Sequence, residues 1–226
     1  MNAILNEELF ADTGKLETNP SSVSAGAQPT VLPDIYNDKI NIAVWQRNFN
    51  QELADAISHF VASNPSLSKS LTVSPETAYE QLDNKLLGSA PKVLLENIVE
   101  LVDMFCCLFD LKQTGLRIAT LSNAMCPRFH VDNVPCRLVS TYQGTATEWL
   151  PNHVLDRSKL GHGNNGKPDS SSGLYTPESS IQQLTCGDVA LLKGELWSGN
   201  ENLGLVHRSP INASSETRLL ITLDFD

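Results

Sequence analysis

The sequence predicts an α+β protein in which N-terminal helices pack on a mainly antiparallel β barrel. Apolar residues recur every three or four positions before Gly115, and after it they alternate with polar residues. No helical segment of convincing length separates the later strands, so they should pair mainly antiparallel. Strands of this number and length favour a sandwich, a jelly roll or a small barrel.

The first half of the chain divides into an arm and a helical part. Residues 1–38 are rich in Ser, Thr, Asn, Pro and acids, a composition that buries little apolar surface, so we expect a flexible arm. Residues 39–114 should form a helical N-terminal part. Its helices are expected within residues 41–63, from Ser74 onward, and over residues 91–112, where the apolar spacing is helical.

Residues 115–226 should form the β domain. The predicted strands are rich in β-branched residues and bounded by turn residues. They are LRIATLSN, CRLVSTYQG, TEWLP, DVALLKGE, LGLVHRSP and TRLLITLDF. Residues 152–180, with GHGNNGKPDSSSG at their centre, interrupt this pattern and predict a polar insertion loop. Loops of this length in compact domains often act as lids or are disordered.

Charge and cysteine content argue against several classes of partner. The net charge is −10 and the sixteen Lys and Arg residues are scattered, so we expect no nucleic-acid partner. No apolar run is long enough for a membrane span, and the acidic N-terminus lacks the basic start of a secretory signal. We therefore expect a cytoplasmic protein. Its five cysteines, an odd number, favour free thiols.

A candidate metal site begins in FHVDNV, at residues 129–134. On a strand, His130 and Asp132 point to the same face. His207, near the end of a later strand, offers a second imidazole. Two histidines and one carboxylate, with the other positions open, are the ligands of non-heme Fe(II) oxygenases. A bare His-x-Asp is more often a hydrogen-bonded pair, but His207 and the strand pattern together favour a metal.

A basic residue accompanies this triad. Arg218 follows His207 by eleven residues (218 − 207) and opens the last strand. The apolar face of that strand consists of Leu219, Ile221, Leu223 and Phe225, so Arg218 lies on the other face. A guanidinium there would suit a carboxylate ligand, which it binds in bidentate fashion. Arg128 and Arg137 are alternative anchors for the anion.

These residues resemble the Fe(II)/2-oxoglutarate oxygenases. In that group a double-stranded β-helix, a jelly-roll or cupin-like barrel, carries His-x-Asp…His and a basic residue soon after the distal histidine. The resemblance implies that His130, Asp132 and His207 hold Fe(II) and that Arg218 binds 2-oxoglutarate. It also implies an oxygenase that acts on a small-molecule or peptide substrate.

A second resemblance covers more of the chain. CPRFHVDNVPCRLVSTYQGTATEWLP, CGDVALLKGE and VHRSP are similar to an uncharacterised bacterial family, the domain of unknown function 1826, from about Trp45 to the C-terminus. No reaction is established for that family. Its association with zinc-homeostasis genes implies zinc as the alternative metal. Cys126 lies four residues before His130, and a thiolate ligand would favour zinc over iron.

Three functions are therefore compatible with the site. The first is the oxygenase. The second is a cupin-like zinc hydrolase or isomerase that uses a metal-bound water, and the third is zinc storage or sensing with Cys126 as a fourth ligand. We favour the oxygenase because only this function uses a basic residue after the distal histidine. The sequence leaves open whether the N-terminal helices form a homodimer surface or brace the barrel.

Overall fold

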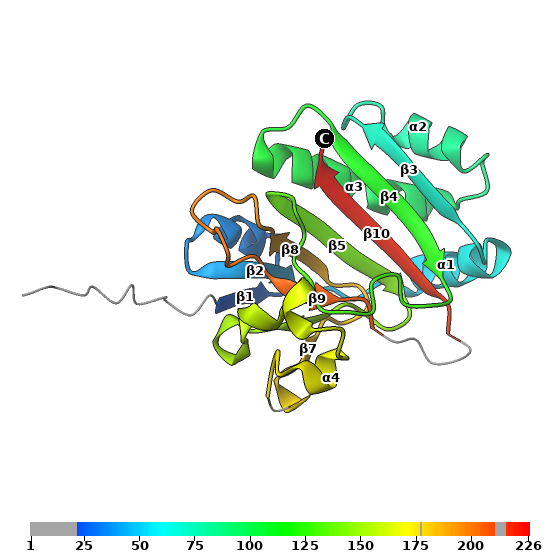
Figure 1. Ribbon diagram of the computed structural model, residues 1–226. Coiled ribbons are helices and arrows are strands. Elements are labelled where there is room, and N and C mark those ends of the chain that lie inside the picture. Colours follow the sequence, from blue (N-terminus) through cyan, green and yellow to red (C-terminus); the bar gives the residue numbers. More distant parts are fainter. Residues whose placement is uncertain (1–21, 177, 211–215) are drawn as a thin grey trace, which may run out of the picture.

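Two β-sheets of unequal size form the middle of the protein, and helices cover one face of the larger sheet (Figure 1). The computed structural model describes residues 22–176, 178–210 and 216–226, so residues 1–21 of the predicted arm lie outside the described residues. The larger sheet consists of β1 (Ser22–Gly26), β2 (Ile40–Trp45), β3 (Ser68–Val73), β4 (Thr114–Leu121), β5 (Cys136–Gln143), β8 (Val189–Lys193) and β10 (Arg218–Phe225). The smaller sheet consists of β6 (Glu148–Leu150), β7 (Gln182–Gln183) and β9 (Val206–Arg208).

The larger sheet is mainly antiparallel, as predicted. Its strand order is β1-β2-β8-β5-β10-β4-β3, and every neighbouring pair is antiparallel except β1 and β2. The order of the smaller sheet is β7-β6-β9, with both pairs antiparallel. The six predicted strands are present as β4, β5, β6, β8, β9 and β10. The α+β class is confirmed.

Helices α1 (Gln51–Ser63), α2 (Ala78–Lys85) and α3 (Lys92–Phe109) pack on the larger sheet. The α3 helix is the predicted third helix, and it ends at Asp110, a left-handed residue with φ 52°. The second helix begins at Ala78 and not at Ser74. The carbonyl of Ser74 accepts hydrogen bonds from the N–H groups of Thr77 and Ala78, so a turn precedes the helix.

The prediction of a helix over residues 41–63 is wrong in its first part. Residues Ile40–Trp45 form β2, and α1 begins only at Gln51. Asn50 caps this helix with its side chain, which accepts a hydrogen bond from Leu53 N at 2.9 Å. The β2 residues INIAVW are almost all buried, so their apolar spacing does not distinguish a strand from a helix.

The described part of the predicted arm is also ordered structure. It forms β1, which pairs in parallel with β2, and a 3-10 helix, η1 (Pro29–Tyr36). Leu32 and Ile35 of this helix are buried in the core, although the composition of the segment as a whole is polar. Two strands from the part predicted to be helical, β2 and β3, join the same sheet as the strands after Gly115.

Two apolar layers flank the larger sheet. On one face Leu219, Ile221 and Leu223 of β10 pack in the cluster formed with the helices. On the other face Leu220 packs in a second cluster, toward Trp149 of the smaller sheet. The alternation predicted for this strand is therefore confirmed. It places Arg218 on the face that looks toward the smaller sheet.

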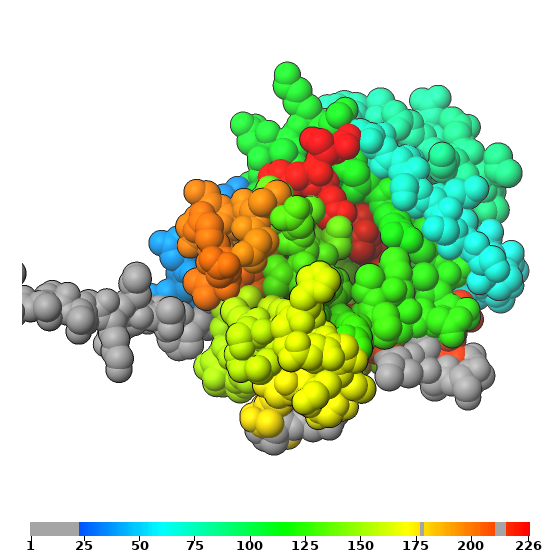
Figure 2. Space-filling model, in the orientation of Figure 1, coloured from blue at the N-terminus to red at the C-terminus, as the bar shows by residue number. Residues whose placement is uncertain are grey.

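Short helices and one β-bridge, between Leu155 and Tyr175, make up the secondary structure in the described part of the insertion at residues 152–180. The helices are η2 (Asn152–Val154), η3 (Arg157–Lys159), η4 (Gly161–Asn164), α4 (Asp169–Ser172) and η5 (Glu178–Ser180). Figure 2 shows this segment, in yellow-green and yellow, as a continuous mass at the lower edge of the molecule. Leu174 and Tyr175 from the insertion join a third apolar cluster. None of the helices in the described ranges is both long enough and apolar enough to cross a membrane.

Candidate metal centre

The two predicted histidine ligands lie side by side, although 77 residues separate them in sequence (207 − 130). A single β-bridge joins them: each residue donates its backbone N–H to the carbonyl of the other, with N–O distances of 3.0 Å. Their imidazole rings are 4.6 Å apart between centroids. The bridge places the His130 segment alongside β9, on the side opposite to β6. Directly paired residues point to the same face of a sheet, so His130 and His207 share one face.

Asp132 completes a group of three side chains. Its Oδ1 lies 3.7 Å from His130 Nε2, and its Oδ2 lies 3.3 Å from His207 Nε2. Ligand atoms of the three residues all lie within 4.8 Å of one another. Within the part of the chain that the structure describes, no other group of three or more His, Cys, Asp or Glu side chains is this close. The structure thus brings together the predicted triad.

Backbone carbonyls determine which imidazole nitrogen is free. His130 Nδ1 lies 2.9 Å from the carbonyl oxygen of Arg128, and His207 Nδ1 lies 3.2 Å from that of Leu205. These contacts place the proton of a neutral ring on Nδ1, which leaves the lone pair on Nε2. With a metal bound, both lone pairs and the Asp132 carboxylate would be directed at one point, whereas without a metal His207 Nε2 can instead donate a hydrogen bond to Asp132. An arrangement of three electron-pair donors around one point favours a bound cation.

The charges in the site agree with this ligand set. Burial opposes ionisation of Asp132, but the hydrogen bond and charge of His207, together with the charge of Arg137, outweigh it and lower the pKa to about 2. Burial and the proximity of His207 lower the pKa of His130. Near neutral pH Asp132 is therefore ionised and His130 is neutral, the states in which both groups bind a metal.

Arg137, one of the alternative anion anchors, is occupied by two carboxylates. Its Nη1 donates to Asp132 Oδ2 at 2.8 Å. Its Nε and Nη2 donate to the two oxygens of Asp224 at 2.6 and 2.9 Å. Arg128, the other alternative, is exposed, and its Nη2 lies 3.5 Å from the carbonyl of Gly166. Arg137 therefore orients Asp132 and is not free for a ligand.

Arg218 lines the same pocket as the triad, a cavity of about 320 Å³. Only 1% of this residue is exposed. Its Nε and Nη2 donate to Thr141 Oγ1 at 3.3 and 3.0 Å, and Nη2 also donates to Thr147 Oγ1 at 2.8 Å. Among the described residues no carboxylate forms a salt bridge with it. Burial lowers the pKa of Arg218 to about 10.

Cys126 lies on the wall of the pocket but outside the triad. It is exposed, and its carbonyl accepts a hydrogen bond from Ser209 N at 2.9 Å. Its sulfur does not belong to the group of atoms within 4.8 Å of one another. The three ligand atoms therefore form a site with open positions, and Cys126 lies at its edge.

Sequence comparison places the chain in a family. The profile of a family described as "protein of unknown function (DUF1826)" matches residues 26–224. The chain belongs to this family. The match includes all residues of the triad and Arg218, and it confirms the resemblance found in the central motif. No curated protein sequence matches the chain.

Solved structures similar to this DUF1826 protein include dioxygenases. The dioxygenase for auxin oxidation 1 from Arabidopsis thaliana, described as a complex with 2-oxoglutarate, matches with a TM-score of 0.50 and 13% identity, over 90% of this chain and 91% of that chain. The corresponding enzyme of rice matches with a TM-score of 0.49 and 12% identity, over 90% and 82%. A full-length Neurospora crassa protein, in complex with alpha-KG, has a TM-score of 0.46 and 8% identity, over 90% and 83%. At these identities the likeness concerns the fold alone.

Three residues of the site were not predicted from the sequence: Thr141, Thr147 and Asp169. On β5, Arg137 and Val139 line the pocket, and Thr141, the next residue on the same face of the strand, borders it. Strand alternation could therefore have indicated Thr141. Thr147 carries no such signal, because it lies between strands. Asp169, in the insertion, contacts the residues beside both histidines.

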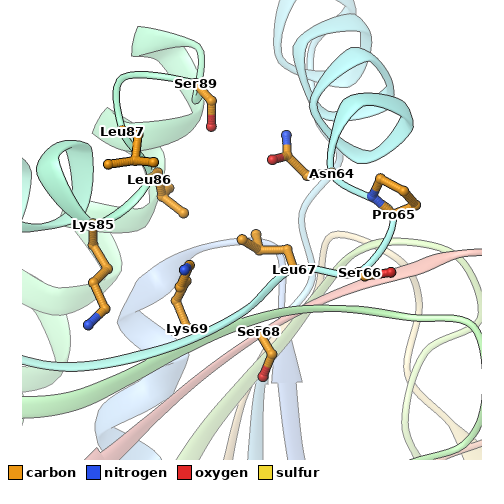
Figure 3. A pocket seen from close by; sticks show the side chains of 10 residues that line it. All are labelled: Asn64, Pro65, Ser66, Leu67, Ser68, Lys69, Lys85, Leu86, Leu87 and Ser89. Atoms are coloured by element: carbon orange, nitrogen blue, oxygen red, sulfur yellow. The ribbon is translucent and has the colours of Figure 1, made fainter.

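A larger cavity of this DUF1826 protein lies away from the triad. It has a volume of about 470 Å³ and is formed where α1 leads into β3, beside the end of α2 (Figure 3). Serine, leucine and lysine side chains line most of it, including Lys69 and Lys85. It contains no histidine, cysteine or carboxylate that could ligate a metal. The pocket with the triad is therefore the candidate site.

Proposed function

We propose that this DUF1826 protein is a non-heme Fe(II)/2-oxoglutarate oxygenase. His130, Asp132 and His207 would bind the metal, and Arg218 would bind the co-substrate. The observation that carries the proposal is the buried Arg218 guanidinium, which faces the triad across one pocket without a carboxylate partner among the described residues. A buried charge without a partner is unfavourable, so an anionic ligand at this position would be bound strongly.

We also infer that the two sheets form a double-stranded β-helix. From β4 onward the chain passes repeatedly between the sheets: β4, β5, β8 and β10 lie in the larger one, and the His130 segment, β6, β7 and β9 lie in the smaller one. Such a path supports a barrel in which both histidines share one wall and Arg218 faces them from the other. The fold likeness to the Arabidopsis dioxygenase also supports it.

The residues of the site fit both the metal and the co-substrate. Two imidazoles and one carboxylate are the ligands that Fe(II) oxygenases use, and they leave positions open for 2-oxoglutarate and oxygen. Bound Fe(II) would supply the chemistry by which one oxygen atom of O₂ converts 2-oxoglutarate to succinate and CO₂ and the other enters a C–H bond of the substrate.

The remaining pocket residues would orient the ligands and exclude water. Arg137 holds Asp132 in place, and the hydroxyl groups of Thr141 and Thr147 fix the Arg218 guanidinium. Apolar side chains on the larger sheet line the space between the two ends of the site: Val139, Leu192 and Leu220. The exposed residues Met125 and Cys126 form part of the rim, where a substrate would enter.

The alternative is a cupin-like zinc protein, either a hydrolase or isomerase or a zinc store. An open site with three protein ligands is also typical of catalytic zinc. A closed storage site would need a fourth ligand, and the position of Cys126 outside the triad does not support it. A buried Arg218 has no evident role in either zinc function, and this is why we prefer the oxygenase.

Anaerobic titration with Fe(II) and 2-oxoglutarate tests the proposal. We expect one metal ion per chain, a visible charge-transfer band when 2-oxoglutarate chelates the iron, and slow release of succinate when oxygen is admitted. His130→Ala should remove metal binding, while His59→Ala, a change at an exposed histidine of α1, should preserve it. Arg218→Met should retain the metal but weaken 2-oxoglutarate binding by roughly 100-fold or more.

A matched control is Lys92→Gln, which removes an exposed cation on α3, a helix that packs on the opposite face of the sheet. It should change neither affinity. The oxygenase proposal is wrong if the protein binds zinc that Fe(II) cannot displace, or if 2-oxoglutarate neither binds to the metal-loaded protein nor is consumed by it.

A further inference from the structure

The insertion contacts the residues adjacent to both histidines through one carboxylate. Asp169, in α4, is 8% exposed. Its Oδ2 accepts a hydrogen bond from the backbone N–H of Phe129 at 2.8 Å and lies 3.7 Å from Arg208 Nη1. Phe129 precedes His130, and Arg208 follows His207. A single buried side chain thus joins the two segments that carry the histidines.

Further contacts hold Arg208 in this position. Its Nε donates to Glu148 Oε2 at 2.6 Å, and Glu148 is its cross-strand partner in the smaller sheet. The guanidinium also lies 4.2 Å from the centroid of the Phe129 ring. Charged groups in such a partly buried network restrict one another, since each loses its partner if another moves. Arg208 is therefore fixed from both β6 and the insertion.

Apolar side chains also join the insertion to the two segments that carry the histidines. Phe129 and Val206 belong to the cluster that also contains Leu174 and Tyr175 of the insertion. The rings of Phe129 and Tyr175 meet edge to face at 5.5 Å between centroids. Because neighbouring residues of a strand point to opposite faces, packing of Phe129 and Val206 against the insertion directs His130 and His207 toward the metal pocket.

We propose that the insertion is a structural part of the metal centre and that Asp169 is a positioning residue for both histidine ligands. This inference rests on the proposed metal site. Asp169 fixes the backbone on which His130 is carried and, through Arg208, the strand on which His207 is carried. Partners of this kind reduce the ordering that a metal must otherwise impose on its ligands. In this role the insertion supports the site.

Metal affinity of three variants tests this role, with Co(II) under anaerobic conditions as the probe. Asp169→Ala removes both contacts and should weaken Co(II) binding by roughly 10–100-fold. Asp169→Asn can still accept the Phe129 hydrogen bond but loses the charge opposite Arg208, so an intermediate effect is expected. Asp156→Asn is the control, because among the described residues the Asp156 carboxylate of the same insertion accepts hydrogen bonds from Ser158 alone. It should bind Co(II) as the wild type does.

Two further measurements distinguish positioning from general damage. The visible absorption band of bound Co(II), which reports ligand geometry, should change in Asp169→Asn and stay the same in Asp156→Asn. Hydrogen exchange in the wild type should slow on Co(II) binding at Phe129 and, together with it, at residues 169–175. If Asp169→Ala does not fold, Asp169→Asn and the exchange experiment decide the question.

The results for the variants and for the wild type separate failure of the positioning role from failure of the metal site. If Asp169→Asn and any folded Asp169→Ala bind Co(II) with wild-type affinity and spectrum, the positioning role is wrong while the metal site stands. It is equally wrong if Co(II) slows exchange at Phe129 but not in the insertion. If the wild type itself binds no Co(II), the proposed function fails, and that result is independent of the variants.

Discussion

Arg137 donates a hydrogen bond from Nη1 to Asp132 Oδ2 at 2.8 Å, so the carboxylate that faces the two histidines also forms an ion pair with a guanidinium. The other side of the same guanidinium binds Asp224 of β10. Arg137 thereby connects the proposed metal ligand to the strand that carries Arg218. The ion pair contributes to the low pKa of Asp132, after the hydrogen bond and charge of His207.

The low pKa of Asp132 predicts a pH-dependent contribution to stability. Its pKa falls from 3.8 to about 2 on folding, which corresponds to about 2 kcal/mol of stabilisation. Since the folded value is depressed, this contribution is present above pH 3.8 and is lost as the pH falls toward 2. Asp132→Asn should therefore lower the free energy of unfolding of metal-free protein at pH 6, and the difference should shrink in acid.

Urea unfolding followed by circular dichroism, with a chelator present, measures this difference between pH 2 and pH 7. Asp103→Asn, which changes an exposed carboxylate on α3, is the control and should alter the free energy of unfolding by less than about 0.5 kcal/mol. A difference between wild type and Asp132→Asn that does not vary with pH would contradict the electrostatic explanation.

Arg218 should lower the stability of the ligand-free protein. The cost of burying its charge is offset in part by two threonine hydroxyls and by the charge of Glu216, but burial still lowers the pKa of Arg218, so the guanidinium is less favourable in the fold than in water. Arg218→Met is therefore expected to raise the free energy of unfolding by about 1–2 kcal/mol. It should also remove the increase in Tm that 2-oxoglutarate gives the metal-loaded wild type.

Lys193→Met provides the contrast for Arg218. Lys193 is also buried, but its Nζ donates to the carbonyl of Asn37 at 2.9 Å and lies 4.9 Å from the Trp197 ring. Its replacement should destabilise the protein and leave the response to 2-oxoglutarate intact. Thermal unfolding with and without the ligand measures both effects. A loss of stability in Arg218→Met comparable to that in Lys193→Met would show that Arg218 has a structural role.

The sequence predicted the parts of the site that depend on local alternation. Arg218 lies opposite the apolar face of β10, as strand alternation predicts. His130 and Asp132 do come together as predicted, but His130 forms only an isolated β-bridge and Asp132 lies outside any strand, so alternation along a strand is not the reason. The pairing of His130 with His207 followed from ligand chemistry and not from any local pattern. The triad and the strands of the β region could thus be predicted from the sequence.

Other features depend on contacts between distant residues, which no local pattern encodes. Arg137 was an alternative anion anchor, but its partner Asp224 is 87 residues away. Asp169 is 40 residues from Phe129, in a segment whose polar composition predicted only a loop. The β2 strand was missed because it is buried on both faces, so its apolar run has no period of two.

Gly194 should be required for the position of Asp132. A Cβ atom at Gly194 would overlap the carbonyl oxygen of Val134 and lie 2.8 Å from that of Asp132. The next residue, Glu195, donates its N–H to the Asp132 carbonyl at 2.9 Å. Gly194→Ala must therefore displace this segment, and we expect a loss of about 1–3 kcal/mol in the free energy of unfolding together with weaker metal binding.

Gly115→Ala is the matched control for this substitution. A Cβ atom there would lie 3.8 Å from the Asp224 carbonyl oxygen, an ordinary contact distance. Metal affinity should be unchanged in this variant. Calorimetric titration with Co(II) and chemical unfolding measure the two quantities, and wild-type metal affinity in Gly194→Ala would show that Asp132 tolerates the shift.

Cys126 decides between an open and a closed metal site. Because it is exposed and lies outside the group formed by the triad, Cys126→Ser should bind Co(II) with unchanged affinity, whereas His130→Ala should lose binding. The wild-type complex should also lack the intense near-ultraviolet band that a thiolate bound to Co(II) produces. A thiolate band that disappears in Cys126→Ser would instead identify a fourth ligand. A fourth protein ligand would close a tetrahedral site, leave no open position for 2-oxoglutarate and favour zinc storage.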